Sequence, residues 1–452
     1  MDNEEKIKTA DDFIEDSKKL IGLPVHDPGM SPLVYGARYG NPCTIDYEKA
    51  AKFSMSLGDD NPLYVDQVYP RSTKWGITLC QPSILTSVRY AICRGAAAWA
   101  RYPEAGLVAG FSLKFNDVIR VGDTFASLFY LKDVLVKKGR TGTLVLKPTE
   151  IAFWNQYKEL VATGTGNHIN ILRELSEEDL KKGEGTRSNM IYERGIYKYS
   201  KEEIKKIVDL TLNEKRQGST PRYWEDVKIG DKLQTMVKGP LTMQDFFKVW
   251  AAIAGVRRVG TFGIALREAI EDYGTGGDRV NPVTGWPYES TEFEHYDFNL
   301  CKGRGLPAPF DIGVMRISIM SNYLSNWMGD GGFIRKFEGQ LRKPNYYGDT
   351  QFYDGEVVNV YEDKIGDVTY GAVDISIAVN NQIGEISAPG KATVYLPSRK
   401  LGQIKLPVPH EDQYERYERY VKDCEYIDKN PPDITKDVTT WRKGFEEWQR
   451  NQ

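Results

Sequence analysis

Two copies of one pattern run through the chain of 452 residues, and this repeat restricts the fold to an architecture built from two like units. In the first copy, Gly-Asp-Thr begins at Gly122 and an Asn-Gln pair begins at Asn155; in the second copy they begin at Gly348 and Asn381. The separation is 33 residues in both copies, and the copies lie 226 residues apart. An acidic residue follows each Asn-Gln pair. This ordered series at equal spacing indicates a duplication.

Each copy is predicted to form one long helix followed by an antiparallel sheet. The segments 124–136 and 369–379 alternate β-branched or aromatic residues with others, which is typical of strands, and the Gly-Asp pairs before the strands favour turns. The upstream stretches 83–100 and 314–328 carry apolar and small residues on several faces, as in a helix buried on more than one side. A sheet that wraps a buried helix is the hot-dog fold. We therefore predict an α+β chain, a double hot-dog whose two sheets join edge to edge.

The same pattern divides the chain into five parts. An N-terminal extension at 1–40 precedes the first hot-dog domain at 41–172, and the second domain occupies 221–398. The charged segment 173–220 between them is predicted to be a solvated helical linker, and 399–452 a C-terminal tail.

Composition argues against several classes of function. The 63 acidic and 60 basic residues give a net charge of −3 and are evenly mixed, so we expect neither nucleic acid nor a membrane surface as a partner. The five cysteines form no Cys-x-x-Cys pair and only four histidines occur, so we expect no metal site and no disulfide framework. The polar start, Met-Asp-Asn-Glu-Glu, has no apolar signal segment, and we expect a cytoplasmic protein.

A short motif in the first copy resembles that of a known family. Residues 58–66 are Gly-Asp-Asp-Asn-Pro-Leu-Tyr-Val-Asp, similar to the D-x-N-P-x-H-x-D signature of MaoC-like hydratases and dehydratases, the (R)-specific enoyl-CoA hydratases. The following segments, 74–85 and 109–125, look like the N-terminal dehydratase domain of the fatty-acid-synthase-like branch. Glu-His-Tyr-Asp at 294–297 and the segments 303–316 and 325–350 look like the matching C-terminal domain. The resemblance covers about residues 45–170 and 230–397.

The resemblance implies where the chemistry lies. In that family an Asp and a His on a segment overhanging the helix act on water and substrate, and an N–H near a Gly at the helix start holds the thioester oxygen. Asp59 and Tyr64 match the motif's Asp and His in the first copy. In the second copy His295 matches the His, Asp297 the trailing Asp, and Gly313 the helix-start Gly. Unpaired N–H groups at a helix N-terminus suit a developing oxyanion.

Neither copy carries the intact Asp/His pair. Tyr64 replaces the His of the first copy, and a tyrosine of pKa about 10 is a poor base at neutral pH. Ser290 stands where the second copy would have its Asp. Ile312 precedes the helix-start Gly, and Asp311 is an acid beside that site. Arg316, one turn into the helix, is either a surface ion-pair residue or the partner that neutralises Asp311.

The candidate site is therefore atypical, with His295 as the expected acid–base group. Asp311 is expected to complement the imidazole, with Asp297 as the second choice. Structural roles stay open for a turn-capping Asp59, an anchoring Asp297, a helix-capping Asp311 and a pocket-lining Tyr64. The full set of candidates is, for catalysis, His295, Asp311, Asp297, Asp59 and Tyr64, and, for substrate binding, Gly313, Ile312, Asn61, Arg316 and Ser290.

The resemblance implies a lyase that adds water to an α,β-unsaturated acyl-CoA or removes it from a β-hydroxyacyl-CoA. Tyr64 and the small residues at 95–98 favour a bulky acyl group. Water addition is acid–base chemistry, so we expect no metal and no cofactor, with acyl-CoA as the substrate. We expect a homo-oligomer, with a second subunit left open. Two alternatives stay open: a non-catalytic acyl-thioester-binding or scaffold subunit, and a hot-dog thioesterase that uses Asp311.

Overall fold

The computed structural model describes residues 10–19, 21–22, 43–88, 104–139, 142–172, 194–254, 281, 283–286, 294–303, 306–410, 418–419, 421–423, 425–426, 429–430 and 438–451. Its helices are α1 (Ala10–Lys18), α2 (Tyr47–Ser56), α3 (Pro62–Val65), α4 (Leu85–Val88), α6 (Lys201–Leu212), α7 (Met243–Ala254), α9 (Phe298–Gly303), α10 (Gly313–Met328) and α12 (Val438–Arg450), with short 3-10 turns η1 (Tyr69–Ser72), η2 (Pro82–Ile84) and η3 (Trp224–Asp226).

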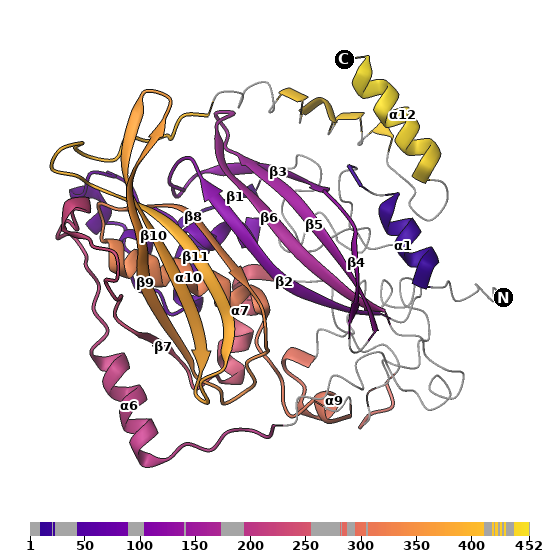
Figure 1. Ribbon diagram of the computed structural model, residues 1–452, viewed down its shortest axis with the longest axis horizontal. Helices are drawn as coiled ribbons and strands as arrows, with labels where there is room; N and C mark the ends of the chain where they lie inside the picture. The colour runs from indigo at the N-terminus through magenta and orange to yellow at the C-terminus, as the bar shows by residue number, and fades with distance from the viewer. Residues whose placement is uncertain are drawn as a thin grey trace.

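The described strands form one 11-stranded sheet. The first copy contributes β1 (Cys43–Thr44), β3 (Thr124–Leu131), β5 (Gly142–Trp154), β6 (Leu160–Leu172) and β2 (Glu104–Phe115), in that order, with β4 (Leu135–Gly139) on β5. The order continues through β8 (Phe333–Gln340), β11 (Ile386–Leu396), β10 (Val368–Asn381), β9 (Gln351–Ile365) and β7 (Met236–Lys238) of the second copy. The two halves lie side by side in Figure 1. The predicted α+β double hot-dog is confirmed.

The two halves join where β2 pairs antiparallel with β8, as the edge-to-edge prediction requires. Phe111 lies opposite Gly339, and Leu113 lies opposite Phe337. The Phe337 ring stacks 6.0 Å from that of Phe115. The backbones approach closely here, because a Cβ on Gly110 would lie 2.2 Å from the carbonyl oxygen of Gly339. The pairing of β2 with β8 therefore requires glycine at position 110.

The repeated residues build the same hairpin corner in both halves. Asn155 and Asn381 each accept hydrogen bonds from the N–H groups two and four residues later, and each donates to the carboxylate of the glutamate four residues later. The glutamines that follow them accept from the N–H of Thr124 and of Thr350, at 2.9 and 3.0 Å, directly after the Gly-Asp turns. The equal spacing in the sequence thus reflects one hydrogen-bonded corner used twice.

The central helix of the second half matches its prediction, and that of the first half is described only at its start. Every residue of α10 from Val314 to Asn326 is buried, and the helix lies against β8, β11 and β2. In the first half, η2 and α4 cover the beginning of the predicted helix 83–100 as far as Val88. Residues 89–100, which include the small residues at 95–98, lie outside the described residues.

The segment between the halves contains α6, whose start is closed by a capping box of Ser200 and Glu203. Part of the predicted linker, 173–193, lies outside the described residues. Within the described part of the chain, no helix is both long and apolar enough to cross a membrane.

Candidate active site

His295 lies against the start of α10. Its Nδ1 is 2.8 Å from the carbonyl oxygen of Phe310, three residues before the first residue of the helix, and the His295 and Phe310 rings meet edge to face with centroids 4.6 Å apart. Trp250 of α7 packs on the imidazole at 5.8 Å. A carbonyl oxygen only accepts hydrogen bonds, so Nδ1 carries the proton and Nε2 is the basic nitrogen of the neutral ring. The contact therefore fixes both the position and the tautomer of a base.

The start of α10 is suited to bind an oxygen. Ile312 is the N-cap residue and is buried, and no side chain caps the helix there. Gly313 is the first helical residue, and a Cβ at that position would lie 2.1 Å from Cδ1 of Leu341. The unpaired N–H groups of a helix start carry partial positive charge. This end of α10 thus offers donors close to His295.

Asp311 is held by an internal ion pair, not by the imidazole. One oxygen lies 2.7 Å from Nε of Arg316, and both side chains are almost fully buried. The carboxylate also accepts from the N–H of Asn345 at 3.1 Å and from Nε2 of Gln351 at 3.2 Å. Burial raises the pKa of Asp311, and the Arg316 guanidinium opposes that rise. These contacts correct the expected Asp311–His295 pair and identify Arg316 as the partner of the acid.

The other candidates of the second copy have structural contacts or are not described. The Asp297 carboxylate accepts from the N–H groups of Asn299 and Leu300, at 2.8 and 2.9 Å, and so caps α9. Ser290 lies outside the described residues. Glu294, directly before the imidazole residue, has a fully buried side chain. Sequence reasoning did not select Glu294, although its place in the Glu-His-Tyr-Asp motif was a usable signal.

The first-copy motif forms a buried turn. Asp59 Oδ1 accepts from the N–H of Asn61 at 3.1 Å, and Asn61 Oδ1 accepts from the N–H of Leu63 at 3.0 Å, which caps α3. Burial raises the pKa of Asp59 to about 6, against the opposing charges of Lys238 and Arg216. The structure thus shows Asp59 capping the turn and Asn61 capping α3, and the pKa of Asp59 lies above its ordinary value.

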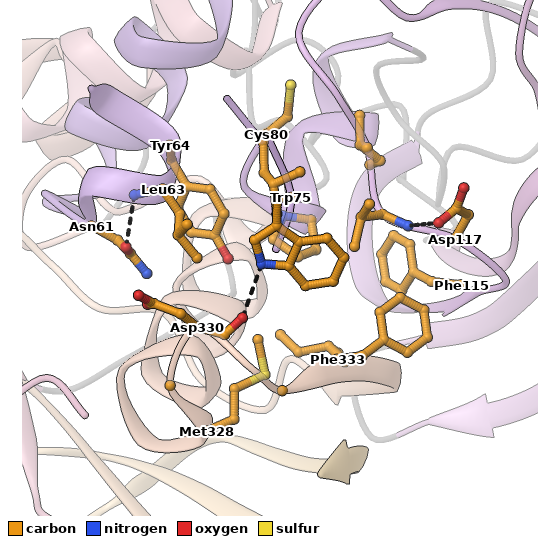
Figure 2. Close-up of a pocket in the computed structure, with 17 residues that line it drawn as sticks. Asn61, Leu63, Tyr64, Trp75, Cys80, Phe115, Asp117, Met328, Asp330 and Phe333 are labelled. Atoms are coloured by element: carbon orange, nitrogen blue, oxygen red, sulfur yellow. Dashed lines mark hydrogen bonds between the residues drawn. The ribbon is translucent and has the colours of Figure 1, made fainter. Parts of the chain in front are cut away.

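Tyr64 lines a pocket between the two halves, shown in Figure 2. Burial raises the pKa of its hydroxyl, and the nearby Asp59 adds to that rise. A phenol with a raised pKa is an even poorer base than an ordinary tyrosine. Tyr64 is therefore placed as a pocket wall and not as a base.

The helix start of the first copy is closed. Gln81 Oε1 accepts from the N–H of Ser83 at 2.9 Å, and Pro82 has no N–H to offer. The Gln81 amide donates to the carbonyl of Ser318 in α10 at 3.2 Å, which holds the cap in place. Of the two helix starts, only that of α10 lacks a side-chain cap. Between these two helix starts, only the N–H groups at the start of α10 lack a side-chain acceptor.

Asp59→Asn should stabilise the protein only at higher pH. The Asp59 carboxyl ionises near its ordinary value in the unfolded chain but at about 6 in the folded protein, so native stability falls as pH rises between these two values. Removing the charge should raise the free energy of unfolding by roughly 3 kcal/mol at about pH 8 and change it little at about pH 4. Urea unfolding of both proteins at the two pH values measures the difference. An equal effect at both pH values would show that this carboxylate is not destabilised by burial.

Comparison with known proteins agrees with this architecture. Residues 36–164 match the family model FAS1-like, dehydratase domain region. A solved structure of a MaoC-like dehydratase is similar at a TM-score of 0.54 and 15% identity, with 80% of this chain and 98% of that chain covered. A MaoC domain protein from Chloroflexus aurantiacus J-10-fl aligns at a TM-score of 0.47 and 13% identity, covering 83% and 99%. No curated protein matches the chain.

A further alignment is with a Mycobacterium tuberculosis protein that has a double hot-dog fold, at a TM-score of 0.42 and 11% identity, covering 78% of this chain and 93% of that one. The family model supports a hydratase or dehydratase role in general terms. Together with the sheet that wraps α10, the similarity to the MaoC-like dehydratase structure shows that the chain has the double hot-dog fold, and the family model matches its first half.

Proposed function

We propose that the chain is an acyl-CoA hydratase or dehydratase, a hydro-lyase in which His295 is the acid–base group. The observation that carries the proposal is the 2.8 Å contact between His295 Nδ1 and the Phe310 carbonyl. It orients a basic Nε2 beside the start of α10, which has no side-chain cap. A base and an oxyanion site next to each other are what water addition to an unsaturated thioester requires.

The proposed reaction follows from this geometry. Nε2 of His295 takes a proton from water as the water oxygen bonds to the β-carbon of the enoyl thioester. The electron pair of the double bond moves toward the thioester oxygen, and the N–H groups at Gly313 stabilise the enolate. The imidazolium then returns its proton to the α-carbon, which completes the addition of one water. Dehydration runs through the same steps in reverse.

Within this proposal the substrate carries a bulky acyl group. The first copy supports this, because its closed helix start and Tyr64 leave it without the donors and the base of a second catalytic centre. A half without catalytic groups can bind part of the acyl group in the space that those groups would otherwise occupy. The chain is proposed to act as a homo-oligomer in the cytoplasm, without a metal or a cofactor.

A panel of enoyl-CoAs tests the proposal directly. The chain should convert branched, cyclic or aromatic enoyl-CoAs, and convert them faster than crotonyl-CoA, with loss of the enoyl absorbance and a mass gain of one water. Release of free thiol would instead indicate a thioesterase. That alternative depended on Asp311, whose carboxylate already forms an ion pair with Arg316 and accepts from Asn345 and Gln351. Binding without any turnover would indicate a non-catalytic acyl-thioester-binding or scaffold subunit. Either result, thiol release or binding without turnover, would refute the proposed lyase activity.

A further inference from the structure

We propose that the exposed face of α9 binds the nucleotide end of a coenzyme A thioester. The inference rests on the proposed function, because it places the carrier of the acyl group beside the same active site. The helix α9 begins three residues after His295. It is anchored by Leu300 and Cys301, which are buried, whereas Phe298 is 40% exposed and so is open to a ligand.

Two aromatic rings form a corner on this face. The Tyr347 ring meets that of Phe298 edge to face, with centroids 5.1 Å apart and planes at 77°. Two rings at nearly a right angle offer a planar group one ring to stack on and a second ring against its edge. An adenine base has this shape and stacks on exposed aromatic side chains. A flexible acyl chain fits less well, because a corner open to water does not enclose it.

A cation lies on the same face of the helix. Lys302 follows Phe298 by four residues, so their side chains are neighbours on α9. Lys302 is exposed, and among the described residues no carboxylate forms an ion pair with it. The Asp297 carboxylate lies at the other end of α9, where it accepts from Asn299 and Leu300. An ammonium beside an aromatic corner matches a nucleotide, which joins a base to phosphate groups.

The corner is connected to the candidate active site by a short stretch of paired backbone. The Tyr347 N–H donates to the Pro309 carbonyl at 2.8 Å, and the next residue, Phe310, holds His295 through its own carbonyl. The chain from Pro309 to Gly313 spans at most about 14 Å. The extended pantetheine arm of coenzyme A is at least this long. One thioester can therefore reach from the aromatic corner to the N–H groups at Gly313.

This site would contribute to affinity and not to chemistry. Phe298 and Lys302 would contact only the carrier, far along the arm from the reacting carbons. Their effect on turnover should therefore appear in KM for a coenzyme A thioester, with kcat unchanged. The same acyl group carried on pantetheine alone lacks the base and the phosphates, so its turnover should not depend on either residue.

Calorimetric titration of the full chain with coenzyme A and with pantetheine tests this inference. Coenzyme A should bind at least about tenfold more tightly than pantetheine, because only coenzyme A can stack a base and pair a phosphate. Phe298→Ala and Lys302→Ala should each weaken the binding of coenzyme A by about tenfold and leave that of pantetheine unchanged. Lys302→Arg keeps the charge and should bind coenzyme A like the parent chain.

The matched controls are Tyr157→Ala, an exposed aromatic residue in the turn between β5 and β6, and Lys364→Ala, an exposed lysine in β9. Both should bind coenzyme A like the parent chain. The inference is overturned if coenzyme A binds no more tightly than pantetheine, or if Phe298→Ala and Lys302→Ala behave like these controls. An equal loss of coenzyme A and pantetheine binding in the α9 variants would also overturn it, because the change would then be structural.

The outcomes separate this site from the proposed lyase. His295→Ala should bind coenzyme A as the parent chain does, so the binding test does not depend on turnover. If coenzyme A binds through α9 but no enoyl-CoA is hydrated, the proposed lyase fails and the nucleotide site stands. If Phe298→Ala does not fold, the comparison of Lys302→Ala with Lys302→Arg still decides, since that side chain is exposed.

Discussion

Replacing His295 by alanine should lower kcat for enoyl-CoA hydration by roughly 10²–10⁴, the usual contribution of a general acid–base group, with little change in KM. The substitution removes the one ring held against the Phe310 carbonyl, at 2.8 Å, beside the uncapped start of α10. Steady-state rates on the best substrate of the panel measure the effect. Thermal unfolding of the same variant shows whether the loss is chemical, since the half-buried imidazole is not part of the central core.

His410→Ala, in the segment that follows the sheet, is the matched histidine control and should retain the parent rate.

Tyr64→Phe should change substrate preference without abolishing turnover, because this phenol lines the pocket of the first half. Full activity in His295→Ala, combined with inactivity in Asp59→Ala or Tyr64→Phe, would place the chemistry in the first half of the chain instead.

Arg316→Met should destabilise the fold by about 3–5 kcal/mol, because it leaves the Asp311 carboxylate buried without its cation. The same guanidinium also donates to the carbonyl of Ser387 at 3.0 Å, so that a second buried group loses its partner. Urea unfolding measures the change in the free energy of unfolding.

The double variant Asp311→Asn/Arg316→Met should recover part of this loss, since it removes the uncompensated charge while an amide oxygen can still accept from the N–H of Asn345. The control is Arg399→Met, whose ion pair with Asp226 is exposed and should be worth at most about 1 kcal/mol. A loss in Arg316→Met no greater than in this control would mean that the buried pair is solvated in the folded protein.

The fold was predictable from the sequence because its signals are local. The corner at Asn155 and the corner at Asn381 each use side chains within a few residues of the turn, together with one glutamine contact back to a Gly-Asp turn. Such contacts keep a fixed spacing in the sequence, so the repeat is visible without a structure. The strand alternation and the apolar stretch 314–328 are equally local, and α10 follows the latter closely.

The candidate site was predictable only in part. His295 belongs to a short motif, and its position followed from the resemblance. The sequence could not assign the partner of Asp311. Whether Arg316 is exposed or buried depends on the strands that cover α10, and the sequence near Arg316 does not show which strands these are. The contact between the Tyr69 hydroxyl and Asp330 could not be predicted, because the two residues lie 261 positions apart in the sequence. The glycine-rich segment 329–332, directly after α10, predicts a turn but does not predict the pocket beside it.

The seam between β2 and β8 has a consequence for synthesis of the chain. Phe115 ends β2, and Phe333, which begins β8, follows it by 218 positions. At translation rates of about 5–20 residues per second, the β2 edge waits roughly 10–45 s for its partner. During that time its Gly110 to Lys114 backbone presents unpaired N–H and C=O groups, which a neighbouring nascent chain can bind. Dense polysomes should therefore favour exchanged dimers, in which β2 of one molecule pairs with β8 of another.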